Sequence, residues 1–169
     1  MAAARRVPRR PLRTRTAKHP RYTVDASVFV NAFNPHEDGH TESLALLAAI
    51  QERSDPIIVP TLLLPEIVSA VARASDDSVG ALRYADATAA LPHLTVVALS
   101  SAMARQAAEL AADHRLRGAD AVYVAIARRY GTTLVSRDEE QRSRAAAVVT
   151  CQTPEQALGS RVAPKRTPR

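Results

Sequence analysis

Lysine is missing from nearly the whole of this sequence: among 169 residues only Lys18 and Lys165 are lysine, and both lie near an end of the chain. Phosphoacceptor domains of the receiver and haloacid-dehalogenase types normally use a lysine to neutralise the phosphoryl group, so this absence argues against them. Glycine is also scarce, with five residues. Neither a Gly-x-x-x-x-Gly-Lys-Ser/Thr loop nor a Gly-x-Gly-x-x-Gly loop after a strand is present, which argues against a phosphate-cradling loop.

Cysteine and long hydrophobic runs are lacking as well. The single cysteine, Cys151, cannot form an internal disulfide, which is typical of the reducing cytoplasm. It lies in an apolar segment and is expected to be a core residue rather than a nucleophile. No apolar run approaches the roughly 20 residues that span a bilayer, so no membrane association is expected. The chain is 46% hydrophobic and long enough for one globular domain.

The net charge of +6 hides an uneven distribution. Twelve of the 23 Lys and Arg residues lie in residues 1–21 and 159–169, which contain no acid. The segment between them therefore holds 11 basic residues and all 17 acidic ones, so its net charge is negative. We expect two disordered basic tails, residues 1–21 and 158–169, around an acidic domain at residues 22–157. Several interpretations of the tails stay open: a solubilising extension, a wrongly chosen start codon, a serine-poor transit peptide, or electrostatic capture of nucleic acid.

Short β-branched segments alternate with longer amphipathic ones between the tails. The expected strands are Tyr22–Asp25, Ile57–Val59, Thr95–Leu99, Thr133–Ser136 and Val148–Cys151. The expected helices are Thr41–Arg53, Thr61–Arg73, Ser78–Leu91, Ser100–Arg115 and Ala119–Tyr130, the last ending at Gly131. Short apolar strands without alternation are typical of strands buried on both faces. The pattern therefore predicts an α/β fold in which helices cover both sides of a parallel sheet.

Four acidic residues border these hydrophobic segments, where a carboxylate is costly unless it has a partner. Asp25 ends the first expected strand, and Asp138 follows the fourth. Asp120 begins a helix, and Glu66 lies in the early turns of another. Because sites in open α/β sheets form at the carboxyl ends of strands, we expect these acids to converge there. Converging carboxylates repel one another, and a divalent cation removes that repulsion, so the pattern indicates a metal site.

Each acid taken alone also has a simpler interpretation. Asp120 is a good helix-capping residue. Asp138 precedes Glu139 and Glu140, which fit a solvated helix. Only the joint pattern of the four acids favours a site over caps and surface charges.

One segment matches the sequence of a zinc-protease motif but not the helical structure that the motif needs. His36-Glu37-Asp38-Gly39-His40 satisfies H-E-x-x-H. That chemistry needs both histidines on one helical face, whereas Pro35 and Gly39 predict a loop here. A zinc protease is therefore not expected.

The segments around the four acids resemble those of the PIN-domain family, and in order and spacing they match the ribonuclease toxins of VapBC-type toxin–antitoxin systems. The matching segments are Val24-Asp25-Ala-Ser-Val-Phe-Val, Pro60-Thr-Leu-Leu-Leu-Pro-Glu66-Ile-Val-Ser-Ala, Gly118-Ala-Asp120-Ala-Val-Tyr-Val-Ala-Ile-Ala and Leu134-Val-Ser-Arg-Asp138. The resemblance covers roughly residues 22–157. Gly39-His40, before the expected Thr41 helix, looks like the family's usual loop.

The resemblance implies a PIN-like three-layer α/β/α fold, with a central parallel sheet of about five strands, and metal-dependent cleavage of RNA phosphodiester bonds. Carried over by position, the residues that would bind Mg²⁺ or Mn²⁺ are Asp25, Glu66, Asp120 and Asp138. Ser27 and Ser136 would be hydrogen-bonding groups of the site, although threonine is common where Ser136 stands. Arg117, Arg128, Arg129 and Arg137 lie near the motifs and would either grip RNA phosphates or be solvated helix charges.

The expected function is a cytoplasmic Mg²⁺- or Mn²⁺-dependent endoribonuclease, the toxin of a toxin–antitoxin pair. Its expected partners are an RNA substrate, a cognate antitoxin and a second copy of the chain, for which the Ser78–Leu91 helix offers an apolar face. Two alternatives stay open. One is a nuclease of RNA processing, or one directed at DNA, without an antitoxin. The other is a catalytically silent RNA-binding PIN domain, against which the intact acids argue.

Overall fold

A five-stranded sheet forms the centre of the computed structural model, which describes residues 20–162 of the chain and side chains up to residue 160. The strands are β1 (Tyr22–Val24), β2 (Ile57–Pro60), β3 (Leu94–Val97), β4 (Thr133–Val135) and β5 (Cys151–Gln152). Their order across the sheet is β3-β2-β1-β4-β5, and each neighbouring pair is parallel. The predicted α/β class with a parallel sheet of five strands is confirmed.

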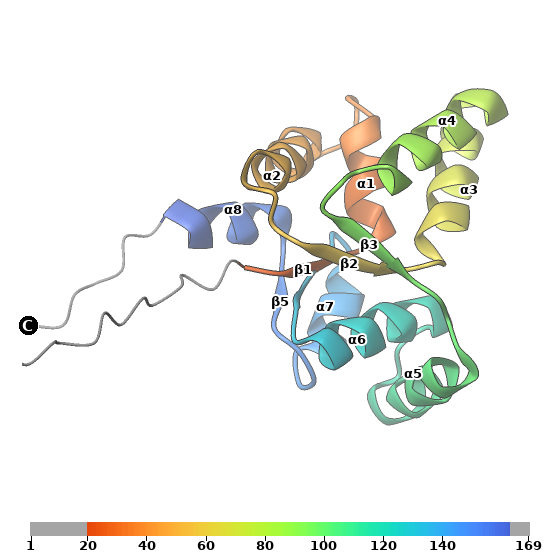
Figure 1. Cartoon of the computed structure of the whole chain (residues 1–169), viewed down its shortest axis with the longest axis vertical. Helices are drawn as coiled ribbons and strands as arrows, with labels where there is room; N and C mark the ends of the chain where they lie inside the picture. Colours follow the sequence, from red (N-terminus) through yellow and green to blue (C-terminus); the bar gives the residue numbers. More distant parts are fainter. Residues whose placement is uncertain (1–19, 163–169) are drawn as a thin grey trace, which may run out of the picture.

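Helices cover both faces of this sheet, which confirms the predicted three layers (Figure 1). They are α1 (Ala26–Phe33), α2 (His40–Arg53), α3 (Leu63–Ser75), α4 (Ser78–Ala89), α5 (Ser101–His114), α6 (Gly118–Tyr130), α7 (Glu139–Ala145) and α8 (Pro154–Val162). Helices α1 to α4 lie on one face and α5 to α7 on the other, because the right-handed crossovers from β1 to β2 and β3 run across the sheet in one direction and those from β3 to β4 and β5 run in the other. In the described part of the chain, no helix is long and apolar enough to cross a membrane.

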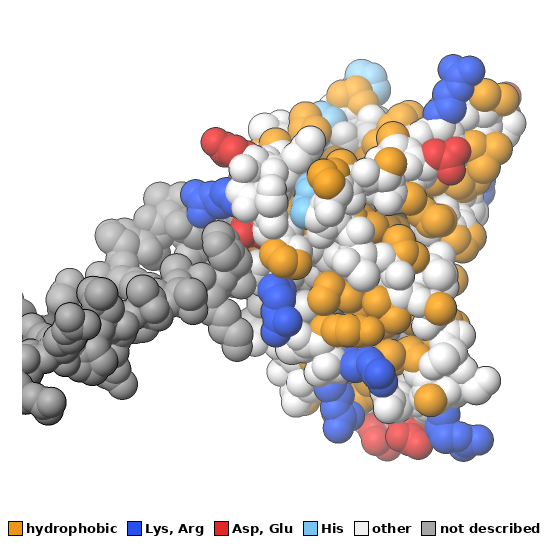
Figure 2. All heavy atoms as spheres, viewed as in Figure 1, with side chains coloured by type: hydrophobic (Ala, Val, Ile, Leu, Met, Phe, Trp, Pro, Cys, Tyr) orange, Lys and Arg blue, Asp and Glu red, His pale blue; other side chains and the backbone are white. Residues whose placement is uncertain are grey.

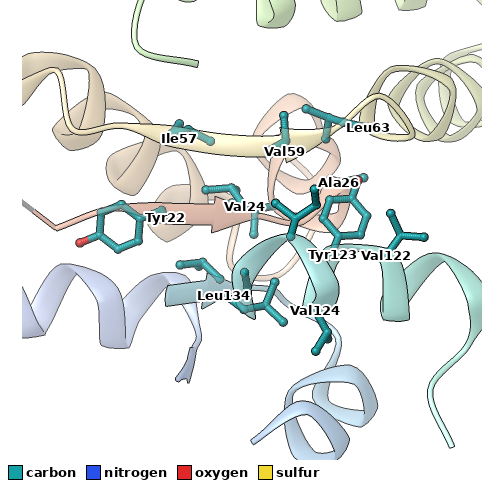
Figure 3. Packing of buried hydrophobic residues seen from close by; sticks show 14 of the residues in the cluster. Tyr22, Val24, Ala26, Ile57, Val59, Leu63, Val122, Tyr123, Val124 and Leu134 are labelled. Carbon is teal, nitrogen blue, oxygen red and sulfur yellow. The ribbon is translucent and has the colours of Figure 1, made fainter. Parts of the chain in front are cut away.

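The central strand β1 is completely enclosed. All three of its residues are buried, because β2 and β4 flank it within the sheet and helices cover it from both sides. Figure 3 shows Val24 of β1 packed between Val59 of β2 and Leu134 of β4, with the Tyr123 ring of α6 beside them. This apolar layer makes the end of β1 a rigid support for the residue that follows it.

Two of the predicted acids begin helices directly after strands. The Asp25 side chain accepts a hydrogen bond of 2.8 Å from the Ser27 backbone N–H and so caps α1. The Asp138 side chain caps α7 in the same way, accepting a 2.9 Å hydrogen bond from the Gln141 backbone N–H. Such caps satisfy backbone donors that have no partner within the helix. They fix both carboxylates at the edge of the sheet where β1 and β4 end.

Some segments differ from the sequence expectations. Residues 26–33, for which no element is expected, form α1. The expected strand at Val148–Cys151 is wrong at its start, because Val148 and Val149 form a turn whose N–H groups donate to the Ala145 carbonyl. Helix α8 continues to Val162, beyond the boundary expected at residue 157. The rest of the two predicted tails lies almost wholly outside the described residues, so their disorder stays a prediction.

Candidate active site

The four predicted acids meet at one edge of the sheet. Strands β1 and β4 are parallel neighbours, so Asp25 after β1 and Asp138 after β4 leave the sheet side by side. Glu66 comes from the first turn of α3 and Asp120 from the first turn of α6. All four line one open pocket of about 550 Å³. The structure therefore brings together the acids that the sequence singles out, while their role as metal ligands stays a prediction.

Asp25 is the most enclosed of the four carboxylates, with 8% of its surface exposed. Its Oδ2 accepts the bond from the Ser27 backbone, and its Oδ1 accepts a 3.2 Å hydrogen bond from Gln141 Nε2. Burial raises the pKa of Asp25, and the bonds from Ser27 and Gln141 oppose that rise. Donors of the chain thus hold both oxygens of a carboxylate that is costly to ionise.

Ser27 and Ser136 connect the ends of β1 and β4. Their hydroxyl oxygens lie 3.4 Å apart. The Ser27 hydroxyl accepts from the backbone N–H of Arg137 at 3.1 Å, and the Ser136 hydroxyl accepts from the backbone N–H of Asp138 at 3.0 Å. Both serines therefore hold the loop that carries Asp138. Their predicted place in the site agrees with these contacts, although none of the contacts tests a part in catalysis.

Glu66 is oriented by a residue outside the predicted set. Tyr123 Oη donates a 2.6 Å hydrogen bond to Glu66 Oε2. Tyr123 follows Asp120 by one turn on α6, so this helix supplies one acid and also the donor that holds a second. Burial raises the pKa of Glu66, the Tyr123 bond opposes that rise, and the charges of Asp25 and Asp120 add to it. The three-residue spacing from Asp120 to Tyr123 is the only sign of this role in the sequence.

Arg117 neutralises part of the acidic edge. Its Nη1 lies 3.3 Å from Asp138 Oδ2, and its Nη2 lies 2.7 Å from Glu140 Oε2. Burial raises the pKa of Asp120 to about 6, and the charges of Asp25 and Asp138 add to the rise, which the Arg117 charge opposes. Arg117 is therefore engaged with acids of the site rather than free to hold a phosphate.

The donor set of the pocket suits a hard divalent cation. Carboxylate and hydroxyl oxygens line it, and Mg²⁺ prefers oxygen ligands. Within residues 20–162, however, no three acidic, histidine or cysteine side chains stand close enough to enclose an ion. An ion would therefore contact one or two carboxylates and complete its shell with water or phosphate, as Mg²⁺ commonly does. The raised pKa values of Asp25, Glu66 and Asp120 reflect burial and repulsion that a cation would relieve.

The other arginines near the motifs lie away from this pocket or are already paired. Arg137 Nη1 lies 3.1 Å from Glu155 Oε1 and also donates to the Gly39 carbonyl at 3.4 Å. Arg128 and Arg129 lie at the opposite end of α6 from the acids and line a separate pocket against α5. For Arg128 and Arg129, the structure favours the alternative interpretation as helix charges outside the site.

Arg73 is the basic residue that lines the acidic pocket, and the motifs do not single it out. It lies seven residues after Glu66 on α3, two turns along the same helical face. Its guanidinium donates to the Ser69 hydroxyl, and it forms no ion pair with an acid of the described residues. The helical spacing of Glu66, Ser69 and Arg73 was the signal in the sequence that could have found it.

The structure argues against two other chemistries. His36 lies in a turn between α1 and α2, whereas His40 is the first residue of α2, so the two histidines share no helical face. Cys151 is half-buried in β5, and burial raises the pKa of its thiol to about 11, which disfavours the reactive thiolate. The zinc-protease motif and the lone cysteine therefore carry no catalytic site.

Known proteins resemble this chain in sequence pattern and in fold. The model of the PIN domain family matches residues 22–147. No curated protein sequence matches the chain. Among solved structures, VapC20 of Mycobacterium tuberculosis, a Sarcin-Ricin loop cleaving toxin, is similar with a TM-score of 0.63 and 22% identity, over 76% of this chain and 96% of its own.

Two further solved structures have similar folds. VapBC2 from Rickettsia felis, bound to a DNA fragment from its promoter, gives a TM-score of 0.59 at 16% identity, over 79% of this chain and 98% of the other. FitAcB from Neisseria gonorrhoeae gives a TM-score of 0.58 at 19% identity, over 79% of this chain and 98% of the other. At these identities the likeness establishes a shared fold.

The charge of Asp120 makes the stability of the metal-free protein depend on pH. Its pKa rises from 3.8 to about 6 on folding, so folding favours the protonated form, and stability is lost as pH rises through this window. Asp120→Asn removes the charge. We expect the variant to be more stable than the wild type at about pH 7.5, by roughly 1 kcal/mol after allowance for solvent screening of this half-exposed group.

Urea denaturation at several pH values measures this difference. It should shrink toward zero as the pH falls below about 3, where Asp120 is protonated in both the folded and the unfolded state. Asp38→Asn, at an exposed loop acid outside the pocket, is the matched control and should show a smaller effect. A difference at Asp120 that is the same at both ends of the pH range would contradict the electrostatic explanation.

Proposed function

The chain belongs to the PIN-domain family, and from that premise we propose that it is a metal-dependent endoribonuclease, the toxin of a toxin–antitoxin pair. The observation that carries this proposal is the pocket at the carboxyl edge of the sheet, where Asp25, Glu66, Asp120 and Asp138 come together. Four carboxylates in one open pocket are electrostatically unfavourable without a cation. The proposed cofactor is Mg²⁺ or Mn²⁺ because both prefer oxygen ligands.

The proposed reaction is hydrolysis of an RNA phosphodiester bond. When bound, a divalent ion supplies Lewis-acid stabilisation of charge on the phosphate and makes an attacking water more acidic. Asp25 and Asp120 are the proposed principal ligands, because burial raises the pKa of both and the charges of neighbouring carboxylates add to the rise. Glu66, held by Tyr123, is a further proposed ligand. Buried contacts on β1 and α6 keep these groups in place, so little reorganisation is needed when the substrate binds.

Arg73 is the proposed anchor for a substrate phosphate. A polyanion approaching four carboxylates is repelled, so a nearby positive charge is needed to hold the backbone of the RNA. Arg73 lines the pocket and has no acidic partner among the described residues, whereas Arg117 and Arg137 each pair with an acid. It lies two turns after Glu66 on α3, and its guanidinium donates to the Ser69 hydroxyl between them.

The proposed protein partners are a cognate antitoxin and a second copy of the chain. Structures with similar folds include a toxin–antitoxin complex, which supports an antitoxin. Hydrophobic side chains cover much of the face seen in Figure 2, including the region of α3 and α4. On α4, Val79 and Leu82 are 57% and 53% exposed, which supports the apolar interaction face expected on this helix. A cytoplasmic location is part of the same proposal.

Substitution of Asp25 tests the proposed chemistry. Asp25→Asn removes the charge but keeps an oxygen that can accept the Ser27 bond, so the helix cap survives. We expect RNA cleavage in Mn²⁺ to fall by more than about a hundredfold without loss of thermal stability. Cleavage is measured on labelled RNA, with Asp38→Asn as the control that should retain activity.

The outcomes separate the alternatives. Equal cleavage by wild type and Asp25→Asn would contradict the proposed site. Wild-type protein that binds RNA without cleaving it would identify a silent binding domain, and cleavage of DNA in place of RNA would identify a DNA-directed enzyme. Growth arrest on expression that disappears with Asp25→Asn would support a toxin. Cleavage without growth arrest would favour a nuclease of RNA processing.

Substitution of Arg73 tests the proposed phosphate anchor. Arg73→Gln should raise KM for RNA about tenfold and change kcat much less, because it removes one phosphate contact that the ground state and the transition state share. The slope of log KM against log salt should also decrease by nearly one. Arg83→Gln, at an exposed arginine of α4 outside the pocket, is the matched control. An unchanged KM and salt slope in Arg73→Gln would refute this role.

A further inference from the structure

Gln141 is a buried polar residue between two of the site acids. Only 1% of its surface is exposed, although it lies on the short helix α7, next to charged residues that are exposed. Long polar side chains are rarely buried this completely unless their groups are paired. The contacts of Gln141 therefore need a specific explanation.

Each end of this residue touches a different carboxylate. The backbone N–H donates to Asp138 Oδ1 at 2.9 Å, and the side-chain Nε2 donates to Asp25 Oδ1 at 3.2 Å. Asp25 and Asp138 follow neighbouring strands, and Asp25 lies 116 residues before Gln141 in the sequence. One residue thus links the carboxylate at the end of β1 with the one at the end of β4.

The amide of Gln141 is only half satisfied. Its Oε1 is buried and has no hydrogen-bond partner among the described residues. A buried acceptor without a partner destabilises the fold, and an apolar side chain of similar size would fill the same space without that cost. Packing alone therefore does not account for a glutamine here, whereas its donor to Asp25 does.

We propose that Gln141 is a positioning residue, which sets the direction of the Asp25 carboxylate and ties it to Asp138. This inference rests on the proposed metal-dependent nuclease function. The amide acts as an uncharged donor: it engages Oδ1 of Asp25 while the Ser27 backbone engages Oδ2, so the carboxylate cannot rotate freely. A carboxylate at position 141 would instead add a negative charge to an edge that already carries four. Groups that hold metal-binding carboxylates typically change metal affinity or activity by 10- to 100-fold when they are removed.

Gln141→Met tests the proposal, because methionine keeps the length of the side chain and removes its hydrogen bonds. Three quantities are measured on the full-length protein: the Kd for Mn²⁺ by calorimetry, kcat and KM for RNA cleavage, and the midpoint of thermal unfolding. We expect the Kd for Mn²⁺ to rise about tenfold and kcat to fall 10- to 100-fold. KM for RNA should stay unchanged, and the unfolding midpoint should be equal or higher.

Gln156→Met is the matched control. Gln156 has the same position relative to its helix start: its N–H donates to Thr153 Oγ1, and its Oε1 accepts from the Thr153 N–H, without contact to a site acid. Gln156→Met removes the bond from the Thr153 N–H to Gln156 Oε1, which should lower the unfolding midpoint slightly and leave Mn²⁺ binding and kcat unchanged.

Three results would overturn the proposal. A lower unfolding midpoint in Gln141→Met, with wild-type Mn²⁺ affinity and kcat, would show a purely structural role. Equal losses of Mn²⁺ affinity in Gln141→Met and Gln156→Met would show a general effect of weakening a helix start. Wild-type protein that neither binds Mn²⁺ nor cleaves RNA would refute the proposed function and this inference together, and that result is distinct from the first two.

Discussion

Repulsion among carboxylates held at the end of an apolar sheet is the constraint on which the rest of this structure depends. Asp25 is buried directly after the central strand, and Glu66 and Asp120 are held close enough for their charges to affect one another. Burial and repulsion both disfavour ionisation. Neighbouring groups partly offset this cost. The Ser27 backbone and Gln141 donate hydrogen bonds to Asp25, and Tyr123 donates one to Glu66. Arg117 forms an ion pair with Asp138. A cation would supply what these donors leave uncompensated.

The same constraint explains which strands and helices position each acid. Strands β1 and β4 are short and enclosed, so the chain leaves them at fixed points, and the helices that begin there use the site acids as caps. The two helices that supply the other acids lie on opposite faces of the sheet: α3 brings Glu66 and α6 brings Asp120 (Figure 1). The pocket therefore needs all three layers, and its geometry belongs to the fold rather than to one motif.

Local sequence patterns were sufficient to predict the strands and acids of the site, but not all the residues that hold those acids in place. The acids at strand ends, the parallel sheet and the glycine that ends α6 follow from short-range signals. Helix α1 was missed because Val28, Phe29 and Val30 favour strands by propensity, and the Asp25 cap with burial on several sides overrides that preference. Tyr123 and Gln141 donate to acids 57 and 116 residues away, so no local spacing pairs them with those acids, although Tyr123 lies one turn after Asp120. The role of Arg73 depends on which face of α3 meets the pocket, which packing decides.

If these carboxylates form one cation-binding site, crystals of the protein soaked in Mn²⁺ should contain an ion among them. Anomalous diffraction locates the ion without reference to activity. We expect a peak in the pocket, in contact with the carboxylates of Asp25 and Asp120, and we expect this peak to be lost in crystals of Asp25→Asn. A pocket without anomalous density at a Mn²⁺ concentration that supports cleavage, or a peak that persists unchanged in Asp25→Asn, would contradict the proposed cation-binding site.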